Sequence, residues 1–372
     1  MLVLVVTLGR DTGPTRFAVA PVGFERLSGW ADDRFSATIP AFLKSCARFL
    51  TRADTAAFDA AAMSADFGRV GDWRALCRTA EALPARDDAA ARRFFEAGFV
   101  PFAVADYGAR EGLFTGYYEI ELKGSRRKHG RYQTPIYRKP PDLGSGLSPT
   151  RAEIEDGALA GRGLELLWVD DPIDAFFLQI QGSGRVRLNG GGTVRVGYDG
   201  QNGHPYIAVG RLLIERGAIS RDKLTMATIR AWMKEYPEAG SALRRENPSY
   251  VFFREISGDG PIGAEGAILT PERSIAVDRA FIGLGIPIWL EADERFAAAE
   301  SVRRLVVAQD TGGAIKGPVR GDVFWVTGNA AGDRAGVMNA RGRCYLLLPR
   351  SVVGRLAPGW LPRQGLGEQR TD

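Results

Sequence analysis

The sequence predicts a mostly β protein of the α+β class with more than one domain. Three observations support this prediction. The chain has 372 residues, more than one ordinary domain needs. Its 46 glycines and 20 prolines favour a turn-rich β architecture over a helical bundle. Helical patterns dominate the first hundred residues, and segments rich in β-branched and aromatic residues follow them.

Three helices are predicted in the N-terminal part. In Ile39–Arg52 the apolar residues recur with a period of about 3.6. A second helix is expected over 72–83, before a proline. A third is expected over 87–97, because it starts with two acidic residues and ends at Gly98. None of these segments carries obvious chemistry, so we interpret them as scaffold.

The middle of the chain is predicted to contain strands with a polar surface. Strands are expected over 112–122 and 175–181, among others. On the second of these, Gln179 and Gln181 alternate with apolar residues, so both amides would point to one face. Gly182-Ser183-Gly184 follows, and together these residues suggest a ligand-facing wall. A single GxG without a following helix is weak support for phosphate binding, so nucleotide binding is disfavoured.

The C-terminal part is predicted to form a small β-barrel. Residues 258–266 are rich in glycine and are interpreted as a linker. The strand-like segments after it are short and closely spaced, with turn residues between them, as in small barrels. These segments are 267–269, 274–277, 286–290, 304–309, 322–326 and 343–348.

Three carboxylates near glycine turns suggest an acid/base site. Asp310 follows an apolar strand and precedes the turn Thr311-Gly312-Gly313, which places its carboxylate at the mouth of a strand. Asp322 and Asp333 each follow a glycine. The two histidines lie far apart, which disfavours a His-based metal site or a Ser-His-Asp triad. An odd number of cysteines without a CxxC motif argues against a disulfide framework or a zinc site.

The charge and the N-terminus limit the possible partners. The net charge is +5, but Lys and Arg are dispersed, so nucleic-acid binding is disfavoured. The apolar run Met1–Leu8 lacks a basic flank and a small-residue cleavage site. No apolar run reaches the ~18 residues that a membrane-spanning helix needs.

Five motifs in a fixed order resemble one known family. The combination looks like the membrane-bound lytic murein transglycosylase A family, and its final part is similar to the family's 3D segment. That segment is named for three aspartates, here Asp310, Asp322 and Asp333. The motifs are Phe114–Tyr118, Gln179–Gly184, Gly197-Tyr198 with Asn202–Tyr206, Asn247–Phe253 and Gln309–Gly317.

The resemblance implies a two-domain fold. One domain would be a double-psi β-barrel formed by residues 1–114, which include the N-terminal helices, and 258–372. An inserted second β domain, residues 115–257, would form the other wall of a groove for a glycan strand.

The resemblance also implies a reaction. The enzyme would cleave the β-1,4 bond between N-acetylmuramic acid and N-acetylglucosamine and leave a 1,6-anhydro-muramyl end. The muramyl C6 hydroxyl would be the nucleophile, so Asp310 alone would act first as acid and then as base. As an acid Asp310 must be protonated, so its pKa is expected to be raised. Asp322 and Asp333 would be supporting acids.

The expected partner is the glycan strand of peptidoglycan, bound by a monomer with no metal and no cofactor. The expected location is the periplasm or the outer membrane. Because the chain shows no cysteine for lipid attachment after Leu8, it would either start upstream or be exported without an anchor. The residues expected to contact substrate are Tyr117, Gln181, Ser183, Gly184, Gly312, Gly313 and Lys316.

Three other functions compete with this hypothesis. An inverting glycoside hydrolase on the same barrel would use Asp310 as acid and Asp322 or Asp333 as base. A non-catalytic glycan-binding protein would use the same groove without cleaving its ligand. An aspartic protease is suggested by the tripeptide Asp310-Thr311-Gly312, but a motif of three residues is too short to carry that assignment.

Overall fold

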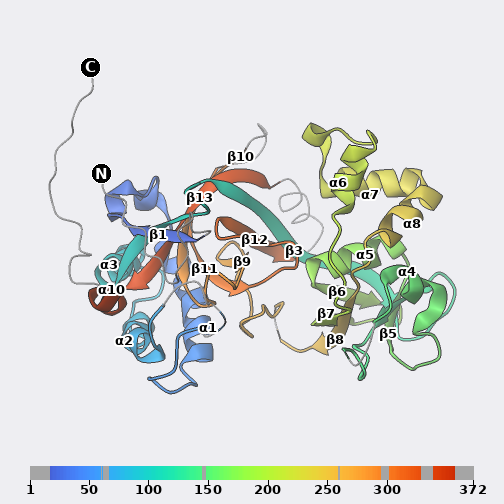
Figure 1. The fold of residues 1–372 in the computed structure, drawn as a ribbon. Helices are drawn as coiled ribbons and strands as arrows, with labels where there is room; N and C mark the ends of the chain where they lie inside the picture. The colour runs from blue at the N-terminus through green and yellow to red at the C-terminus, as the bar shows by residue number, and fades with distance from the viewer. Residues whose placement is uncertain are drawn as a thin grey trace. The chain divides into compact units, whose positions relative to one another are not determined.

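The computed structural model describes residues 17–59, 61, 67–144, 148–258, 260–294, 301–327 and 338–356. The chain divides into two compact units (Figure 1). Unit 1 combines residues 1–115, 263–324 and 339–372, and unit 2 combines residues 116–262 and 325–338. The architecture is mixed α+β with a large sheet, so helices contribute more than the mostly β prediction allowed.

Unit 1 contains helices and strands from both ends of the chain, and three of the four described helices come from the N-terminal region. Its helices are α1 (Ile39–Phe49), α2 (Val70–Glu81), α3 (Asp88–Gly98) and α10 (Arg350–Leu356). Its strands are β1 (Ala18–Pro21), β2 (Phe99–Ala105), the first part of β3 (Gly112–Ser125), β9 (Ser274–Val277), β10 (Pro287–Glu294), β11 (Val302–Asp310), β12 (Arg320–Thr327) and β13 (Asn339–Pro349).

The strands of unit 1 are hydrogen-bonded in a closed order. From β13 the order runs through β10, β11, β9 and β12 to β3, and β3 pairs again with β13. Strands β11 and β9 are parallel, whereas β12 runs antiparallel to β9 (Figure 1). Five of the six strand segments predicted after residue 266 are strands. Residues 267–269 are not, although the structure describes them.

Aromatic residues fill the space between the helices and strands of unit 1. The helices predicted from period and capping are confirmed as α1, α2 and α3, with bounds that differ by a few residues. Their apolar faces meet in the ring contacts Phe42–Phe94, Phe42–Phe95 and Phe42–Phe99. Burial of such side chains stabilises the unit by about 25 cal/mol for each Å² of apolar surface removed from water.

The cysteine prediction needs a correction. Cys46 on α1 and Cys77 on α2 form a disulfide, with their Cα atoms 5.8 Å apart, and Cys344 is buried with a free thiol. Both bonded cysteines lie on the buried faces of their helices, which pack together. The odd number of cysteines therefore consists of one disulfide and one free, buried cysteine.

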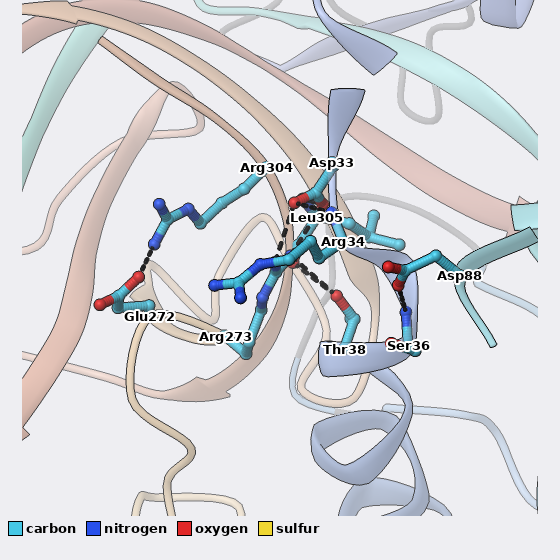
Figure 2. A network of polar contacts seen from close by, with 9 residues as sticks. All are labelled: Asp33, Arg34, Ser36, Thr38, Asp88, Glu272, Arg273, Arg304 and Leu305. Atoms are coloured by element: carbon cyan, nitrogen blue, oxygen red, sulfur yellow. Dashed lines mark hydrogen bonds and ion pairs between the residues drawn. The ribbon is translucent and has the colours of Figure 1, made fainter. Parts of the chain in front are cut away.

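A buried ion pair joins the N-terminal region to the strands of unit 1 (Figure 2). The guanidinium of Arg273 donates to both carboxylate oxygens of Asp33, at 2.7 and 2.8 Å. Asp33 also accepts the backbone N–H of Leu305 on β11. Arg273 also donates to the hydroxyl of Thr38 and the carbonyl of Leu305. Arg304 pairs with Glu272 nearby. Because the Asp33 carboxylate and both terminal nitrogens of Arg273 have hydrogen-bond partners, the burial of the pair is tolerated.

Unit 2 combines short helices with a second set of strands. Strand β3 pairs with β5 and β6, and the order continues through β7 to β8. The strands are β4 (Thr134–Tyr137), β5 (Glu165–Val169), β6 (Ser183–Leu188), β7 (Thr193–Gln201) and β8 (Val251–Ile256), together with the second part of β3. The helices are α4 (Arg151–Glu153), α5 (Pro172–Gln181), α6 (Val209–Glu215), α7 (Met226–Glu235) and α8 (Pro237–Arg245).

The strand predicted over 175–181 is wrong, because these residues belong to helix α5. Asp171 caps the helix by accepting the N–H of Ile173, Pro172 occupies the first turn, and Gly182 ends it in a left-handed conformation. The nearly continuous apolar stretch resembled a buried strand, since α5 is buried on most sides. Its residues pack in the main core of unit 2 with strands β3, β5, β6 and β7.

In the part of the chain that the structure describes, no helix is both long enough and apolar enough to cross a membrane.

Candidate functional site

Asp310 is the last residue of β11 and follows an irregularity in the strand. Val307 lies opposite Ser274 and Ala308 opposite Ile275, but the next paired residue, opposite Ala276, is Asp310. Gln309 is therefore an extra residue in the ladder, a β-bulge. The bulge places Asp310 beside Ala276 at the end of the strand.

Asp322 lies in the same row as Asp310. On β12 it is the partner of Ala276, so the two acids flank one alanine from the two neighbouring strands. Residues directly opposite one another in a sheet project to the same face. The Cα atoms of Asp310 and Asp322 are therefore about 10 Å apart, twice the spacing of neighbouring strands. The structure thus brings together two of the three predicted acids.

Backbone amides hold the carboxylate of Asp310. Its Oδ1 accepts the N–H of Ala264 and the N–H of Thr311, each at 2.9 Å. One donor follows Asp310 directly, and the other comes from a segment 46 residues earlier. Two donors on one oxygen fix the orientation of the carboxylate plane.

The carboxyl group of Asp322 is held by a threonine and stands beside an arginine. The Thr115 hydroxyl donates to Asp322 Oδ1 at 2.5 Å and accepts from the Arg320 guanidinium at 2.9 Å. Withdrawal of this carboxyl from water raises the pKa of Asp322, although Arg320 and the Thr115 hydrogen bond oppose the shift. Burial also lowers the pKa of Arg320. Thr115 belongs to the FTGYY motif, but the sequence did not indicate that it would contact an acid.

Part of the segment predicted as a linker is a turn, residues 263–267, which donates a backbone hydrogen bond to Asp310. Gly263 and Ala267 are joined by a backbone hydrogen bond of 2.9 Å, and the N–H of Glu265 donates to the carbonyl of Gln309 at 3.1 Å. A Cβ atom on Gly263 would lie 2.4 Å from that carbonyl oxygen. Glycine at this position is therefore needed for the close approach of the two backbones.

Gly263→Ala is expected to lower both stability and activity. The added methyl must push the turn from Gln309, because the atom it meets is backbone rather than a flexible side chain. We expect a loss of about 1–3 kcal/mol in the free energy of unfolding, measured by urea denaturation. The control is Gly313→Ala, since a Cβ there meets nothing within 4 Å. Equal stability of the two variants would contradict the prediction.

The side chain of Gln309 enters a buried network. It donates to the carbonyl of Ala41 and to the Ser45 hydroxyl, both at 2.9 Å, and accepts from the Ser274 hydroxyl at 2.6 Å. Ser45 in turn donates to Glu265 Oε2 at 2.6 Å. The bulge is thus anchored to α1 on one side and to β9 on the other.

Glu265 is a buried acid that the sequence did not single out. Removal of its carboxyl from water raises the pKa of Glu265 to about 7, against the hydrogen bonds from Ser45 and Gln309 and the charge of Arg48. The nearby charge of Asp59 adds to the increase. In the sequence Glu265 is one acidic residue in a glycine-rich stretch, and nothing in that pattern shows its burial.

Glu265→Gln is expected to change how stability depends on pH. The folded-state pKa lies above the ordinary value of 4.5, so the folded protein binds this proton more tightly than the unfolded chain. Stability from this group is therefore complete below pH 4.5 and is lost as pH rises to about 7. The total is roughly 3 kcal/mol. Relative to wild type, Glu265→Gln should gain that amount between pH 4 and pH 8, measured by denaturation at both values.

Glu81→Gln is the control for this experiment, because Glu81 is exposed on α2. Its stability relative to wild type should not change between pH 4 and pH 8. A constant difference for Glu265→Gln as well would show that the pKa of Glu265 is the same in the folded and the unfolded chain, which would contradict the prediction.

The turn after Asp310 carries three of the predicted substrate contacts. Gly312 and Ile315 are joined by a backbone hydrogen bond of 3.0 Å. Gly313 and Lys316 are exposed, and the N–H of Gly317 donates to Asp278. These positions leave the backbone at Gly313 open to a ligand. Asp333, the third predicted acid, lies outside the described residues.

The other predicted contacts lie in unit 2 and are buried. Gln181 accepts the N–H of Tyr118 at 3.0 Å and donates to the sulfur of Met226. Tyr117 and Ser183 are almost fully buried. At Gly184 a Cβ would lie 2.5 Å from a methyl of Leu178 and 3.0 Å from the carbonyl oxygen of Ile120, so packing favours glycine there. Their role in substrate binding stays a prediction.

Gln179 does not share a wall with Gln181. Residues two apart on a helix point in different directions, and each amide has its own partner. Gln179 accepts from Arg151 at 2.7 Å. The Arg151 guanidinium is buried between the rings of Phe176 and Tyr250. This part of the QIQGSG motif therefore supports the interior of unit 2.

No group of three or more His, Cys, Asp or Glu within the described residues is placed to hold a metal ion. Of the three predicted acids, Asp310 and Asp322 lie on the same face of the sheet in unit 1.

Comparison with known proteins places the chain among murein-cleaving enzymes. Residues 113–254 match the MltA specific insert domain, and residues 273–348 match the 3D domain. Membrane-bound lytic murein transglycosylase A of Escherichia coli K12 is 36% identical over 254 residues, which are 66% of this chain and 68% of that protein.

Solved structures agree with the sequence comparison. The membrane-bound lytic murein transglycosylase from Agrobacterium tumefaciens superposes with a TM-score of 0.81 and 32% identity, over 91% of this chain and 99% of that one. The E. coli MltA structure with bound chitohexaose has a TM-score of 0.69 and 28% identity, over 91% and 96% of the two chains.

Proposed function

The chain belongs to the family of membrane-bound lytic murein transglycosylase A, and on this basis we propose that it cleaves the glycan strands of peptidoglycan. The bond cut is the β-1,4 linkage between N-acetylmuramic acid and N-acetylglucosamine, and the product is a 1,6-anhydro-muramyl end. One observation carries the proposal. Asp310, the first aspartate of the 3D domain, sits at the open end of a strand with its carboxylate aligned by two amides.

Asp310 would perform both proton transfers. Its protonated carboxyl gives a proton to the glycosidic oxygen, the bond from C1 to that oxygen breaks, and N-acetylglucosamine leaves with a free hydroxyl. The muramyl C6 oxygen then bonds to C1, and its proton passes to the Asp310 carboxylate. The acid is regenerated and no water is consumed. Because the nucleophile belongs to the substrate, it acts at a high effective concentration and a second catalytic carboxylate is not required.

Asp322 would support this site without exchanging protons with the substrate. It is held by Thr115 and stands beside Arg320, and the pKa of Asp322 is raised by burial. In this position Asp322 would tie β12 to β3 on the face that carries Asp310.

The solved relative with bound chitohexaose supports a glycan as ligand. We propose that Gly312, Gly313 and Lys316 contact the sugar near Asp310, because their turn follows it directly and is open. The backbone N–H groups of the two glycines suit a developing negative charge. Lys316 suits the carboxyl group of a muramyl residue.

The finer architecture belongs to the same proposal. We propose that residues 1–114 and 258–372 form a discontinuous domain and that its ring of strands is a double-psi barrel. The closed strand order and the parallel pair β9–β11 support this. Residues 115–257 form the inserted domain.

The cell envelope is the proposed location. The relatives are named as membrane-bound enzymes. The Cys46–Cys77 disulfide also fits an oxidising compartment such as the periplasm, since such bonds rarely persist in the cytosol.

Product analysis tests the function. Purified peptidoglycan is digested in water enriched in ¹⁸O, and the released fragments are weighed by mass spectrometry. Anhydro ends are lighter than reducing ends by one water and carry no ¹⁸O. Reducing ends that contain ¹⁸O would overturn the proposal, and so would the absence of any released fragment.

One alternative has an observation in its favour. Inverting hydrolases hold their two carboxyl groups roughly 6.5–9.5 Å apart, and the row Asp310–Ala276–Asp322 gives a backbone separation of similar size. In that case Asp322 would activate water, and the ¹⁸O label would enter every new end. The hydrogen bond that already occupies Asp322 argues against this role.

A further inference from the structure

The catalytic strand is anchored by a chain of buried hydrogen bonds that the proposed reaction does not use. The chain links Glu265, Ser45, Gln309 and Ser274 through side-chain bonds of 2.6, 2.9 and 2.6 Å. It ends at the backbone N–H of Thr270, which donates to Ser274 at 2.7 Å. All of these residues belong to unit 1.

The numbers of donors and acceptors fix which group donates in each of these hydrogen bonds. A serine hydroxyl has a single proton, and Ser45 donates it to Glu265. Ser45 must therefore accept the bond from the Gln309 amide. The Gln309 amide is thereby oriented, with its nitrogen toward α1 and its oxygen toward Ser274 on β9. Glu265 thus acts as the final acceptor for the polar groups around the bulge.

Glu265 also reaches Asp310 by a second, shorter route through the backbone. The N–H of Glu265 donates to the carbonyl of Gln309, and the N–H of the preceding residue, Ala264, donates to the Asp310 carboxylate. The side chain of Glu265 ties this segment to α1 through Ser45. The same residue therefore fixes the strand that carries Asp310 and the amide that aligns its carboxylate.

We propose that Glu265 is a positioning residue for Asp310, acting through Ser45, the Gln309 bulge and the Ala264 amide. The expected effect on kcat rests on the proposed function, whereas the expected effect on the position of the Asp310 carboxylate does not depend on it. Glu265 does not touch the reacting atoms. Its loss frees both the bulge and the turn, and displacement of a catalytic group by about 1 Å can cost roughly a hundredfold in rate.

The test compares three variants with wild type in steady-state cleavage of purified glycan strands. Glu265→Leu removes the acceptor for both Ser45 and the Gln309 amide, and Ser45→Ala removes the hydroxyl that bridges them, with little change of volume. We expect kcat to fall by about 10- to 100-fold in both, with KM within about twofold of wild type. Glu265→Gln keeps an acceptor oxygen for Ser45 and should retain kcat within about twofold.

Glu291→Leu is the matched control for a structural role. Glu291 is a second buried acid of unit 1 that accepts hydrogen bonds, from the Ser28 N–H and the Tyr345 hydroxyl. In the sheet, Glu291 lies opposite Arg303 on β11. Arg303 is seven residues before Asp310, which places Glu291 about 23 Å from Asp310 along the strand direction. This variant should lower the melting temperature and leave kcat unchanged.

The proposal is overturned if Glu265→Leu and Ser45→Ala behave like Glu291→Leu, with lower melting temperatures and wild-type kcat. It is also overturned if Glu265→Gln fails to restore kcat, or if KM changes in place of kcat. Crystal structures of Ser45→Ala and wild type supply a readout independent of activity. Even if wild type released no anhydro product, so that the proposed function failed, an unmoved Asp310 carboxylate in Ser45→Ala would refute the positioning role and a displaced one would support it.

Discussion

Asp310→Asn is expected to lower the rate of anhydro-product release by about 10³-fold or more, because in the proposed mechanism this one group supplies both the acid and the base. Asparagine has nearly the same shape and keeps an oxygen that accepts the N–H groups of Ala264 and Thr311. The amide cannot protonate the glycosidic oxygen. The measurement is mass spectrometry of products released from purified peptidoglycan, with equal amounts of folded enzyme.

Binding separates this result from a general loss of the site. Chitohexaose affinity of Asp310→Asn, measured by calorimetry, should stay within a few-fold of wild type, since the backbone of the turn is unchanged. Asp293→Asn is the control, because Asp293 is exposed on β10. Substantial activity in Asp310→Asn would remove Asp310 from the mechanism. Inactivity of wild type with intact binding would favour a non-catalytic glycan-binding protein.

Asp33→Ala is expected to destabilise the protein by about 3–5 kcal/mol, because it leaves the charge of Arg273 buried without its partner. Asp33 accepts four hydrogen bonds, two from Arg273 and one each from the backbone N–H groups of Arg34 and Leu305 (Figure 2). The guanidinium of Arg273 would keep only neutral partners, Thr38 and the Leu305 carbonyl. The free energy of unfolding in guanidinium chloride measures the loss.

Two further variants identify the cause of that loss. Asp33→Ala combined with Arg273→Met removes both charges, so the double variant should be less destabilised than the sum of the two single changes. Asp54→Ala breaks an exposed ion pair with Arg74 and should cost less than about 1 kcal/mol. If Asp33→Ala cost no more than Asp54→Ala, the buried pair would contribute little to stability.

The parts of the fold that could be predicted from sequence are those set by local pattern. The periodic apolar residues of α1 and the capping residues of α3 act within one helix, so their bounds are close to the prediction. The apolar run before Asp310 and the glycines after it placed that acid at the end of a strand, where it is found. The three-aspartate pattern indicated Asp322 as well, without showing that it shares a face with Asp310.

The remaining features depend on contacts between distant segments. Helix α5 was missed because its apolar surface is buried nearly all round, which removes the periodicity that distinguishes helix from strand. Glu265 was missed because its raised pKa comes from burial beneath α1, a helix 220 residues earlier in the sequence. The bulge at Gln309 is a property of pairing between β9 and β11, and one strand alone does not reveal it.

The bulge also lets strand β11 do two things at once, which are to pair with β9 and to bind α1. If Gln309 were deleted, Ala308 and Asp310 would be consecutive residues, and they would still pair with Ile275 and Ala276. The extra residue is thus dispensable for the register of the acid, and its side chain is free to serve α1. For protein engineering, this makes position 309 a place where the attachment of β11 to α1 can be varied while the pairing of β11 with β9 is preserved.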